Sequence, residues 1–177
     1  MLTCDRFARS KLVTRAMRDK RKRITTTRRR RNQDRGGGFF RHLMVPIDLS
    51  GRHERVFKMV RTLVAGRACR VTLFHVVQRV PGIATTELDG FYRRLVKTAD
   101  RRLRQIAGSF AKHGIDVRIQ VTIGEPATDI IRAAARERVD VLVMSSHKVR
   151  LGRRARGWGT TSYKVGIFSQ CPILLVK

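Results

Sequence analysis

The stretch Val139-Asp-Val-Leu-Val-Met144 is an almost continuous apolar run that has the length of one strand. Such a run is typical of a strand buried on both faces, as in a parallel sheet that helices cover on each side. Further short apolar runs lie at residues 42–48, 70–77, 115–123 and 172–177. Segments with helical periodicity separate them, so the chain predicts an α/β domain: a doubly wound, five-stranded parallel sheet with helices on both faces.

The spacing of apolar residues also predicts where individual elements lie. Residues 115–123 alternate apolar and polar side chains, which indicates a strand with one exposed face at an edge of the sheet. The run at 139–144 is expected at the centre. Helices are expected from about Arg52, over 128–138 and from Thr160 to about Ser169. In a longer helix we expect one buried apolar face, formed by Phe91, Leu95, Leu103, Ile106 and Phe110.

The charge of the chain is strongly positive, with 40 Lys and Arg residues against 13 Asp and Glu residues and a formal net charge of +27. A surplus of this size suggests an anionic partner. Residues 1–38 hold 14 of the basic residues and 3 of the acidic ones, and such a segment has too little apolar surface to fold alone. We therefore expect residues 1–40 to be a basic, disordered arm and residues 41–177 to be the folded domain.

Three interpretations of the basic arm stay open. Its arginines could displace counterions from nucleic acid or another polyanion, which would give salt-sensitive binding without sequence preference. The arm could instead be a solvated tail, or upstream sequence that a wrong choice of start codon brings in. A transit peptide for an organelle is the third interpretation, since such peptides are rich in Arg and poor in acidic residues.

Composition argues against several classes of protein. The cysteines Cys4, Cys69 and Cys171 are too few and too far apart for a disulfide framework or a zinc site. No apolar run approaches the roughly 20 residues of a membrane span, and no apolar segment follows the basic N-terminus as in a secretory signal. His75 lies inside an apolar strand, where a structural role is expected. We therefore expect a cytoplasmic protein with neither a metal site nor a membrane span.

Asp48 follows the first apolar run, so its carboxylate should project beyond the carboxyl end of a strand. Ligands of doubly wound sheets bind at this edge, where the strand order reverses. The carboxylate could accept a hydrogen bond from an amino or hydroxyl group of a ligand, such as an adenine or ribose edge. Alternatively, Asp48 caps the following helix, a role that Ser50 could equally take.

A second strand end, at residues 145–162, is rich in glycine and in cations. Glycines let the backbone approach a phosphate, and the amides of a helix that begins at Thr160, Thr161 and Ser162 form an anion site. The alternative is a surface loop with capping hydroxyls. The cations of this segment have no acidic neighbour and favour anion binding; they are Lys148, Arg150, Arg153, Arg154 and Arg156.

No catalytic constellation can be assembled from these residues. Only Asp48 and His147 are expected to meet near one crevice, and catalysis by a nucleophile also needs a base and an orienting acid within reach. The sequence therefore predicts that the protein is not an enzyme.

Several short motifs follow one another along the folded part in a distinctive order. They are Val45-Pro-Ile-Asp-Leu-Ser50, Leu73-Phe-His-Val-Val77, Gly124-Glu-Pro126, Asp140-Val-Leu-Val-Met-Ser-Ser-His147, and Gly159-Thr160 followed by Cys171-Pro-Ile-Leu-Leu-Val176. Together they resemble the universal stress protein family over residues 41–177. The resemblance implies a sheet of strand order 3-2-1-4-5, a homodimer formed through the last strand and, in one subgroup, ATP held between strands one and four.

In the ATP-binding subgroup, the resemblance places Asp48 on the adenine, with Pro46 and Val76 lining the base. The phosphates and ribose are held in that subgroup by Gly-x-x-Gly, nine residues, and then Gly-Ser or Gly-Thr. Gly159 and Thr160 match the final pair of this pattern.

The rest of the pattern differs. Ser145 and Lys148 replace the first two glycines, and ten residues separate Lys148 from Gly159. A side chain at either position narrows the approach of a triphosphate to the backbone, whereas the charge of Lys148 could offset part of that loss by pairing with a phosphate.

Two hypotheses for function follow. The first is a universal stress protein, a stress-response dimer that binds an adenine nucleotide such as ATP without catalysis. The second is a regulatory protein that binds no nucleotide and uses its basic arm and surface to bind nucleic acid or another polyanion. Slow ATP hydrolysis ranks last, because no group is placed to activate water. The first hypothesis uses Pro46, Asp48, Val76, Ser145, His147, Lys148, Gly159, Thr160, Thr161 and Ser162.

Overall fold

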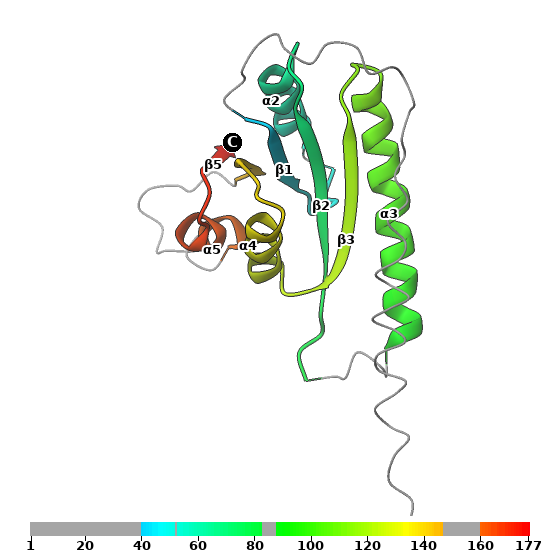
Figure 1. The fold of residues 1–177 in the computed structure, drawn as a ribbon. Coiled ribbons are helices and arrows are strands. Elements are labelled where there is room, and N and C mark those ends of the chain that lie inside the picture. Colours follow the sequence, from blue (N-terminus) through cyan, green and yellow to red (C-terminus); the bar gives the residue numbers. More distant parts are fainter. Residues whose placement is uncertain (1–39, 52, 83–87, 147–159) are drawn as a thin grey trace, which may run out of the picture. The chain divides into compact units, whose positions relative to one another are not determined.

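The computed structural model describes residues 40–51, 53–82, 88–146 and 160–177. Within these ranges the chain forms a five-stranded parallel sheet of order β3-β2-β1-β4-β5 (Figure 1). The predicted doubly wound sheet and its implied strand order are thereby confirmed. The arm predicted at residues 1–40 falls almost wholly outside the described residues and stays a prediction. The strands are β1 (His42–Pro46), β2 (Arg70–Gln78), β3 (Val117–Gly124), β4 (Val141–Ser145) and β5 (Ile173–Val176).

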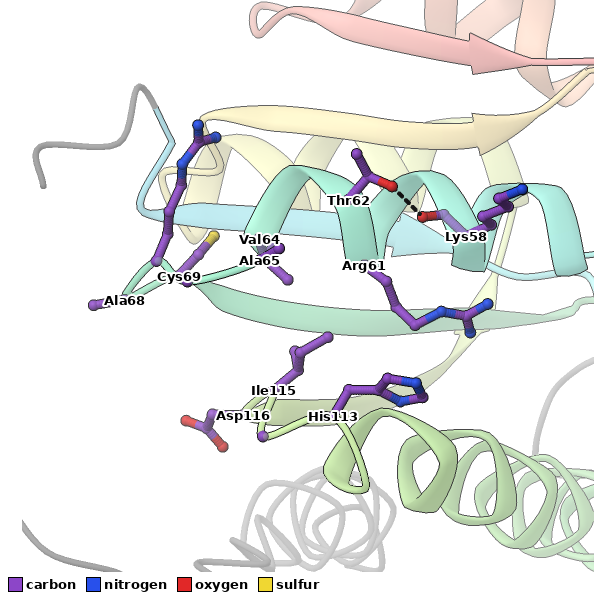
Figure 2. Close-up of a pocket in the computed structure, with 13 residues that line it drawn as sticks. Lys58, Arg61, Thr62, Val64, Ala65, Ala68, Cys69, His113, Ile115 and Asp116 are labelled. Carbon is purple, nitrogen blue, oxygen red and sulfur yellow. Dashed lines mark hydrogen bonds between the residues drawn. The ribbon is translucent and has the colours of Figure 1, made fainter.

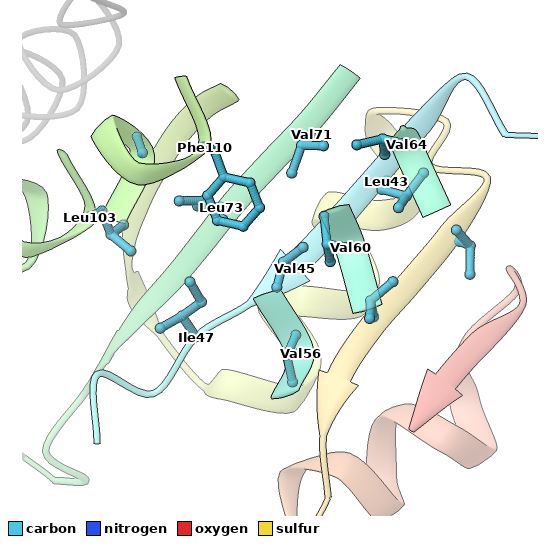
Figure 3. Close-up of a cluster of buried hydrophobic side chains, with 13 residues drawn as sticks. Leu43, Val45, Ile47, Val56, Val60, Val64, Val71, Leu73, Leu103 and Phe110 are labelled. Carbon is cyan, nitrogen blue, oxygen red and sulfur yellow. The ribbon is translucent and has the colours of Figure 1, made fainter. Parts of the chain in front are cut away.

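Helices cover both faces of the sheet. On one face, α2 (Glu54–Val64) and α3 (Asp89–Ala111) enclose an apolar cluster with the sheet (Figure 3). On the other face, α4 (Pro126–Arg136) and α5 (Thr161–Phe168) enclose a second cluster. Within the described ranges, no helix combines the length and the apolar content that crossing a membrane requires.

Strand β1 shows why the central strands have continuous apolar sequences. Leu43 and Val45 belong to the cluster under α2 and α3, whereas Met44, between them, belongs to the cluster under α4 and α5. Successive side chains of a strand point to opposite faces, so both faces of β1 are buried. Burial on both faces makes apolar residues favourable at every position rather than at alternate ones.

Polar side chains anchor the amino ends of the central strands. The Asp140 carboxylate accepts hydrogen bonds from the backbone amides of Arg41 at 2.6 Å and His42 at 2.8 Å. The buried His42 ring lies 2.8 Å from the Thr72 hydroxyl. Burial lowers the pKa of His42, because desolvation disfavours the charged imidazole. Asp140, which directly precedes the apolar strand β4, therefore has a structural role at the start of β1.

Helix α3 departs from the prediction in its first half. Phe91 and Leu95 were expected on the buried face but are 43% and 37% exposed, whereas Tyr92 is fully buried. The Tyr92 hydroxyl accepts a hydrogen bond from the Val80 amide at 2.8 Å. A tyrosine is tolerated in the core when its polar tip has such a partner. In the second half of the helix, Leu103 is buried as predicted.

Candidate functional site

The carboxyl ends of β1 and β4 lie side by side, because the two strands are parallel neighbours in which Met44 pairs with Leu142. Asp48, two residues beyond the end of β1 at Pro46, therefore lies near the point where β4 ends at Ser145. The strand order also reverses here, since β2 lies on one side of β1 and β4 on the other. Doubly wound sheets bind their ligands in such a crevice.

The Asp48 carboxylate is exposed but held in place. Its Oδ1 atom accepts a hydrogen bond from the Ser50 backbone amide at 2.8 Å and lies 2.7 Å from Nε2 of His53. The Asp48 side chain is 53% exposed, whereas that of His53 is 4% exposed. Partial burial would raise the pKa of Asp48, but hydrogen bonds from Ser50 and the charge on His53 outweigh it, so this pKa is lowered. Asp48 is therefore an ionised acceptor open to a ligand.

The helix-capping alternative for Asp48 and Ser50 is wrong. The N-cap of α2 is His53, and its side chain makes no capping hydrogen bond. Asp48 instead closes a turn onto Ser50, in which Leu49 and Gly51 have φ values of 60° and 81°. A left-handed conformation is costly for leucine, and such strain concentrates at functional sites. The turn thus directs the chain back toward the start of α2.

His53 is the residue at this site that the sequence analysis missed. Its ring lies 5.8 Å from the Phe57 ring, centroid to centroid, on the next turn of α2. The available signal was weak: a polar residue five positions after Asp48, just before an amphipathic helix. A second imidazole also contacts this strand end, since Nδ1 of His75 is 2.7 Å from the Ile47 carbonyl oxygen. The structural role expected for His75 agrees with this contact.

Pro46 and Val76 lie on the same face of the sheet. Pro46 follows Met44 by two residues and Val76 follows Phe74 by two, and both Met44 and Phe74 belong to the cluster under α4 and α5. Pro46 pairs with Phe74 in the register of β1 and β2. Both Pro46 and Val76 are buried on the face of the sheet that α4 and α5 cover.

The start of α5 supplies hydroxyl groups. Thr160 is the N-cap, and its Oγ1 accepts a hydrogen bond from the Tyr163 amide at 3.3 Å. The Ser162 hydroxyl lies 3.4 Å from the same oxygen. Thr160, Thr161 and Ser162 are all partly exposed. Three further predicted site residues, His147, Lys148 and Gly159, lie outside the described residues.

A separate hollow of about 840 Å³ lies at the opposite, amino edge of the sheet, between the end of α2 and the turn after α3 (Figure 2). Arg61, one of its basic residues, pairs with Glu54 at 2.8 Å. The Thr62 hydroxyl donates a hydrogen bond to the Lys58 carbonyl of its own helix at 3.1 Å (Figure 2). Polar groups of this hollow are thus already engaged in contacts within the fold.

Across the described ranges, no group of three or more His, Cys, Asp or Glu residues is placed to hold a metal ion.

Comparison with known proteins finds relatives that are similar to this chain over its folded part. The universal stress protein YxiE of Bacillus subtilis (strain 168) is 25% identical over 149 residues, which cover 78% of this chain and 99% of that protein. The structure of the protein MJ0577 is similar, with a TM-score of 0.67, 25% identity, and coverage of 78% of this chain and 96% of that one.

More distant solved structures share the fold. A universal stress protein of Arabidopsis thaliana with AMP bound has a TM-score of 0.57 and 17% identity over 77% of this chain and 91% of its own. Two others are complexes with cAMP and dAMP. The model of the universal stress protein family matches residues 39–177. This chain therefore belongs to the universal stress protein family.

Proposed function

We propose that the folded domain binds an adenine nucleotide, ATP included, at the carboxyl edge of β1 and β4, as part of a cytoplasmic stress-response homodimer. The observation that carries the proposal is the ionised, half-exposed Asp48 carboxylate, fixed where the strand order reverses. Relatives of the same fold in complex with AMP, dAMP or cAMP support an adenine ligand.

Each proposed contact follows from the chemistry of the residue. The base lies on the apolar floor of Pro46 and Val76, and its amino group donates a hydrogen bond to Asp48. Lys148 pairs with a phosphate. The remaining members contact the ribose and phosphates through hydroxyls, a ring nitrogen or the backbone; they are Ser145, His147, Gly159, Thr160, Thr161 and Ser162.

The proposal is binding without catalysis. A general base works best when its pKa lies near the working pH. The pKa of Asp48 is lowered by Ser50 and His53 even though burial opposes the shift, so this carboxylate is a weak proton acceptor at neutral pH. It is suited to accept a hydrogen bond and poorly suited to activate water.

Isothermal titration calorimetry with ATP and with AMP tests the proposal. Asp48→Asn keeps the shape of the side chain and removes its charge, and we expect it to weaken binding about tenfold, as for loss of a hydrogen bond to a charged acceptor. Asp116→Asn, at the amino edge of the sheet, is the matched control and should bind as the wild type does. Absence of binding at millimolar nucleotide in the wild type would refute the proposal.

The exposed apolar side chains near the C-terminus support the homodimer. Strand β5 is an edge strand, and Leu175 on it is 41% exposed. Ile167 and Phe168 at the end of α5 are 56% and 63% exposed. An apolar edge strand is a template for pairing with another chain, so a second copy paired along β5 would cover this surface.

Binding of a polyanion is the second candidate function, and the outer face of α3 favours it. Arg94, Lys97 and Arg101 are exposed and recur at spacings of three and four residues, which aligns them along one side of the helix. By contrast, Arg93 and Arg104 are paired with Asp89 at 3.2 Å and Asp100 at 2.7 Å. Within the described ranges no acid is paired with the first three cations, so their charge is available to phosphates.

Salt dependence of binding to duplex DNA tests this candidate. Replacing Arg94, Lys97 and Arg101 by Gln should reduce the slope of log affinity against log salt by roughly 2.7, because each neutralised phosphate contributes about 0.9. Binding by the wild type that fails to weaken between about 50 and 200 mM salt would contradict the counterion mechanism. The control replaces three cations outside this face of α3 by Gln: Lys58, Arg67 and Arg132.

A further inference from the structure

A buried imidazole lies directly behind the exposed carboxylate of the proposed site. The His53 side chain is 4% exposed, and its Nε2 atom is shielded from solvent. Its one close polar neighbour among the described residues is Oδ1 of Asp48, at 2.7 Å. The ring is not aligned for a hydrogen bond to Oδ1, so the contact is a close electrostatic approach of Nε2 to the carboxylate. Burying a polar atom without an aligned hydrogen bond is costly, and the nearby carboxylate offsets part of that cost.

The arrangement restrains the carboxylate in one orientation. The Ser50 amide and the His53 ring both approach Oδ1, so neither contact uses the second oxygen, Oδ2. The Ser50 hydrogen bond and the close approach of the His53 ring restrain the rotation of the Asp48 side chain. Oδ2 is thereby oriented to accept from a ligand amino or hydroxyl group in a fixed direction, which lowers the entropy lost on binding.

The imidazole is itself fixed by the core. His53 is the N-cap of α2, and its carbonyl accepts a hydrogen bond from the Phe57 amide at 2.9 Å. The Phe57 ring then packs edge-on against Phe110 of α3, with the centroids 5.4 Å apart. The orientation of Asp48 therefore depends on the packing of two helices as well as on the turn through Leu49 and Gly51.

We propose that His53 is the positioning residue of the nucleotide site, which holds the Asp48 carboxylate ready to accept the ligand's hydrogen bond. This inference rests on the proposed adenine-nucleotide site. His53 is assigned no proton transfer. Among the described residues, the charged side chain that faces its ring is that of Asp48.

The first test needs no nucleotide. The titration of Asp48 is followed by NMR of its side-chain carboxyl carbon in the wild type and in His53→Phe, which keeps an aromatic ring beside Phe57. Loss of the His53 contact should raise the pKa of Asp48, because that contact favours the carboxylate. His113→Phe changes an exposed histidine at the amino edge and should leave the titration unchanged. An identical Asp48 titration in wild type and His53→Phe would overturn the inference.

The second test measures AMP affinity by calorimetry in the same proteins. His53→Phe should weaken binding about tenfold, and His53→Gln, which restores a donor near Oδ1, should recover most of that loss. Equal losses in the Phe and Gln variants would overturn the positioning role, since that result marks His53 as a packing residue. The wild type could fail to bind AMP and ATP while the Asp48 titration still responds to His53→Phe. That result would refute the nucleotide site and, with it, the role of Asp48 and His53 in binding a ligand. The circular dichroism spectrum shows whether each variant is folded.

Discussion

Gly124, the last residue of β3, leaves room for a side chain of α4 to accept a hydrogen bond from the amide of the N-cap residue Glu125. A methyl group added at Gly124 would overlap Oδ2 of Asp129 and lie 2.8 Å from its Cγ. That carboxylate accepts a hydrogen bond from the Glu125 amide at 2.8 Å. Because Gly124 does not have a left-handed φ, its backbone conformation would itself tolerate alanine. Gly124→Ala should therefore act mainly by displacing the Asp129 carboxylate.

The expected cost follows from two opposing terms. Loss of a capping hydrogen bond costs about 1–2 kcal/mol. The smaller conformational entropy of the unfolded alanine chain offsets about 0.4–1 kcal/mol of that cost. Gly124→Ala should lower the free energy of unfolding by about 1 kcal/mol. In an Asp129→Ala background the overlap is gone, so the same change should instead stabilise by about 0.5 kcal/mol.

Urea denaturation followed by circular dichroism measures these differences in the two single variants and the double variant. Gly108→Ala is the matched control, because its added methyl meets nothing within 4 Å and lies inside α3, where alanine is favoured by up to about 1 kcal/mol. If Gly124→Ala were as stable as the wild type, or equally harmful with and without Asp129, the role of the Asp129 carboxylate at the Glu125 amide would be refuted.

Three further predictions concern stability and assembly. The lowered pKa of the buried His42 means that the unfolded chain binds a proton more readily. The free energy of unfolding should then fall as the pH drops below about 6.5, by up to about 1.4 kcal/mol per unit, and His42→Asn should flatten this slope in urea titrations at several pH values. Tyr92→Phe leaves the Val80 amide without its acceptor and should cost about 1–2 kcal/mol in thermal denaturation, whereas an unchanged stability would argue against that bond. Leu175→Asp places like charges on the proposed β5 interface and should convert a dimer to a monomer in light scattering; an unaltered dimer would exclude that interface.

The burial of the strands could be predicted because each position in the sheet imposes its own pattern, whereas the strand order was implied by the family resemblance. The run at 139–144 indicated a strand buried on both faces, and β4 lies inside the sheet between β1 and β5. The middle of the sheet, where this run was expected, is occupied by β1 instead. The alternation at 115–123 indicated an edge strand, and β3 is at the edge. The alternating residues Val117, Ile119 and Val121 pack against the cluster under α2 and α3.

The register of α3 could not be predicted in its first half. Phe91 and Leu95 fit an apolar stripe as well as Tyr92 does, and hydropathy favours the first two. The choice depends on a tertiary contact, since the Val80 amide satisfies the Tyr92 hydroxyl in the core. Periodicity carries no information about that partner.

The position of Asp48 beyond a strand end was predicted, but its partner was not. His53 approaches Asp48 because the chain turns back through Leu49 and Gly51, both with positive φ. Leucine gives no sequence signal for a left-handed conformation, so the turn could not be foreseen. The glycine-containing part of the predicted site, with His147, Lys148 and Gly159, lies outside the described residues and stays a prediction.

Amide chemical-shift mapping with ATP tests the central claim most directly, because it locates the ligand as well as detecting it. The account predicts that the largest shifts occur at Ser50, Val76 and Thr160–Ser162, around the carboxyl ends of β1 and β4, and that they saturate as the nucleotide is added. Shifts confined to the amino-edge hollow near Cys69 and His113, or no saturable shifts at millimolar ATP, would contradict it.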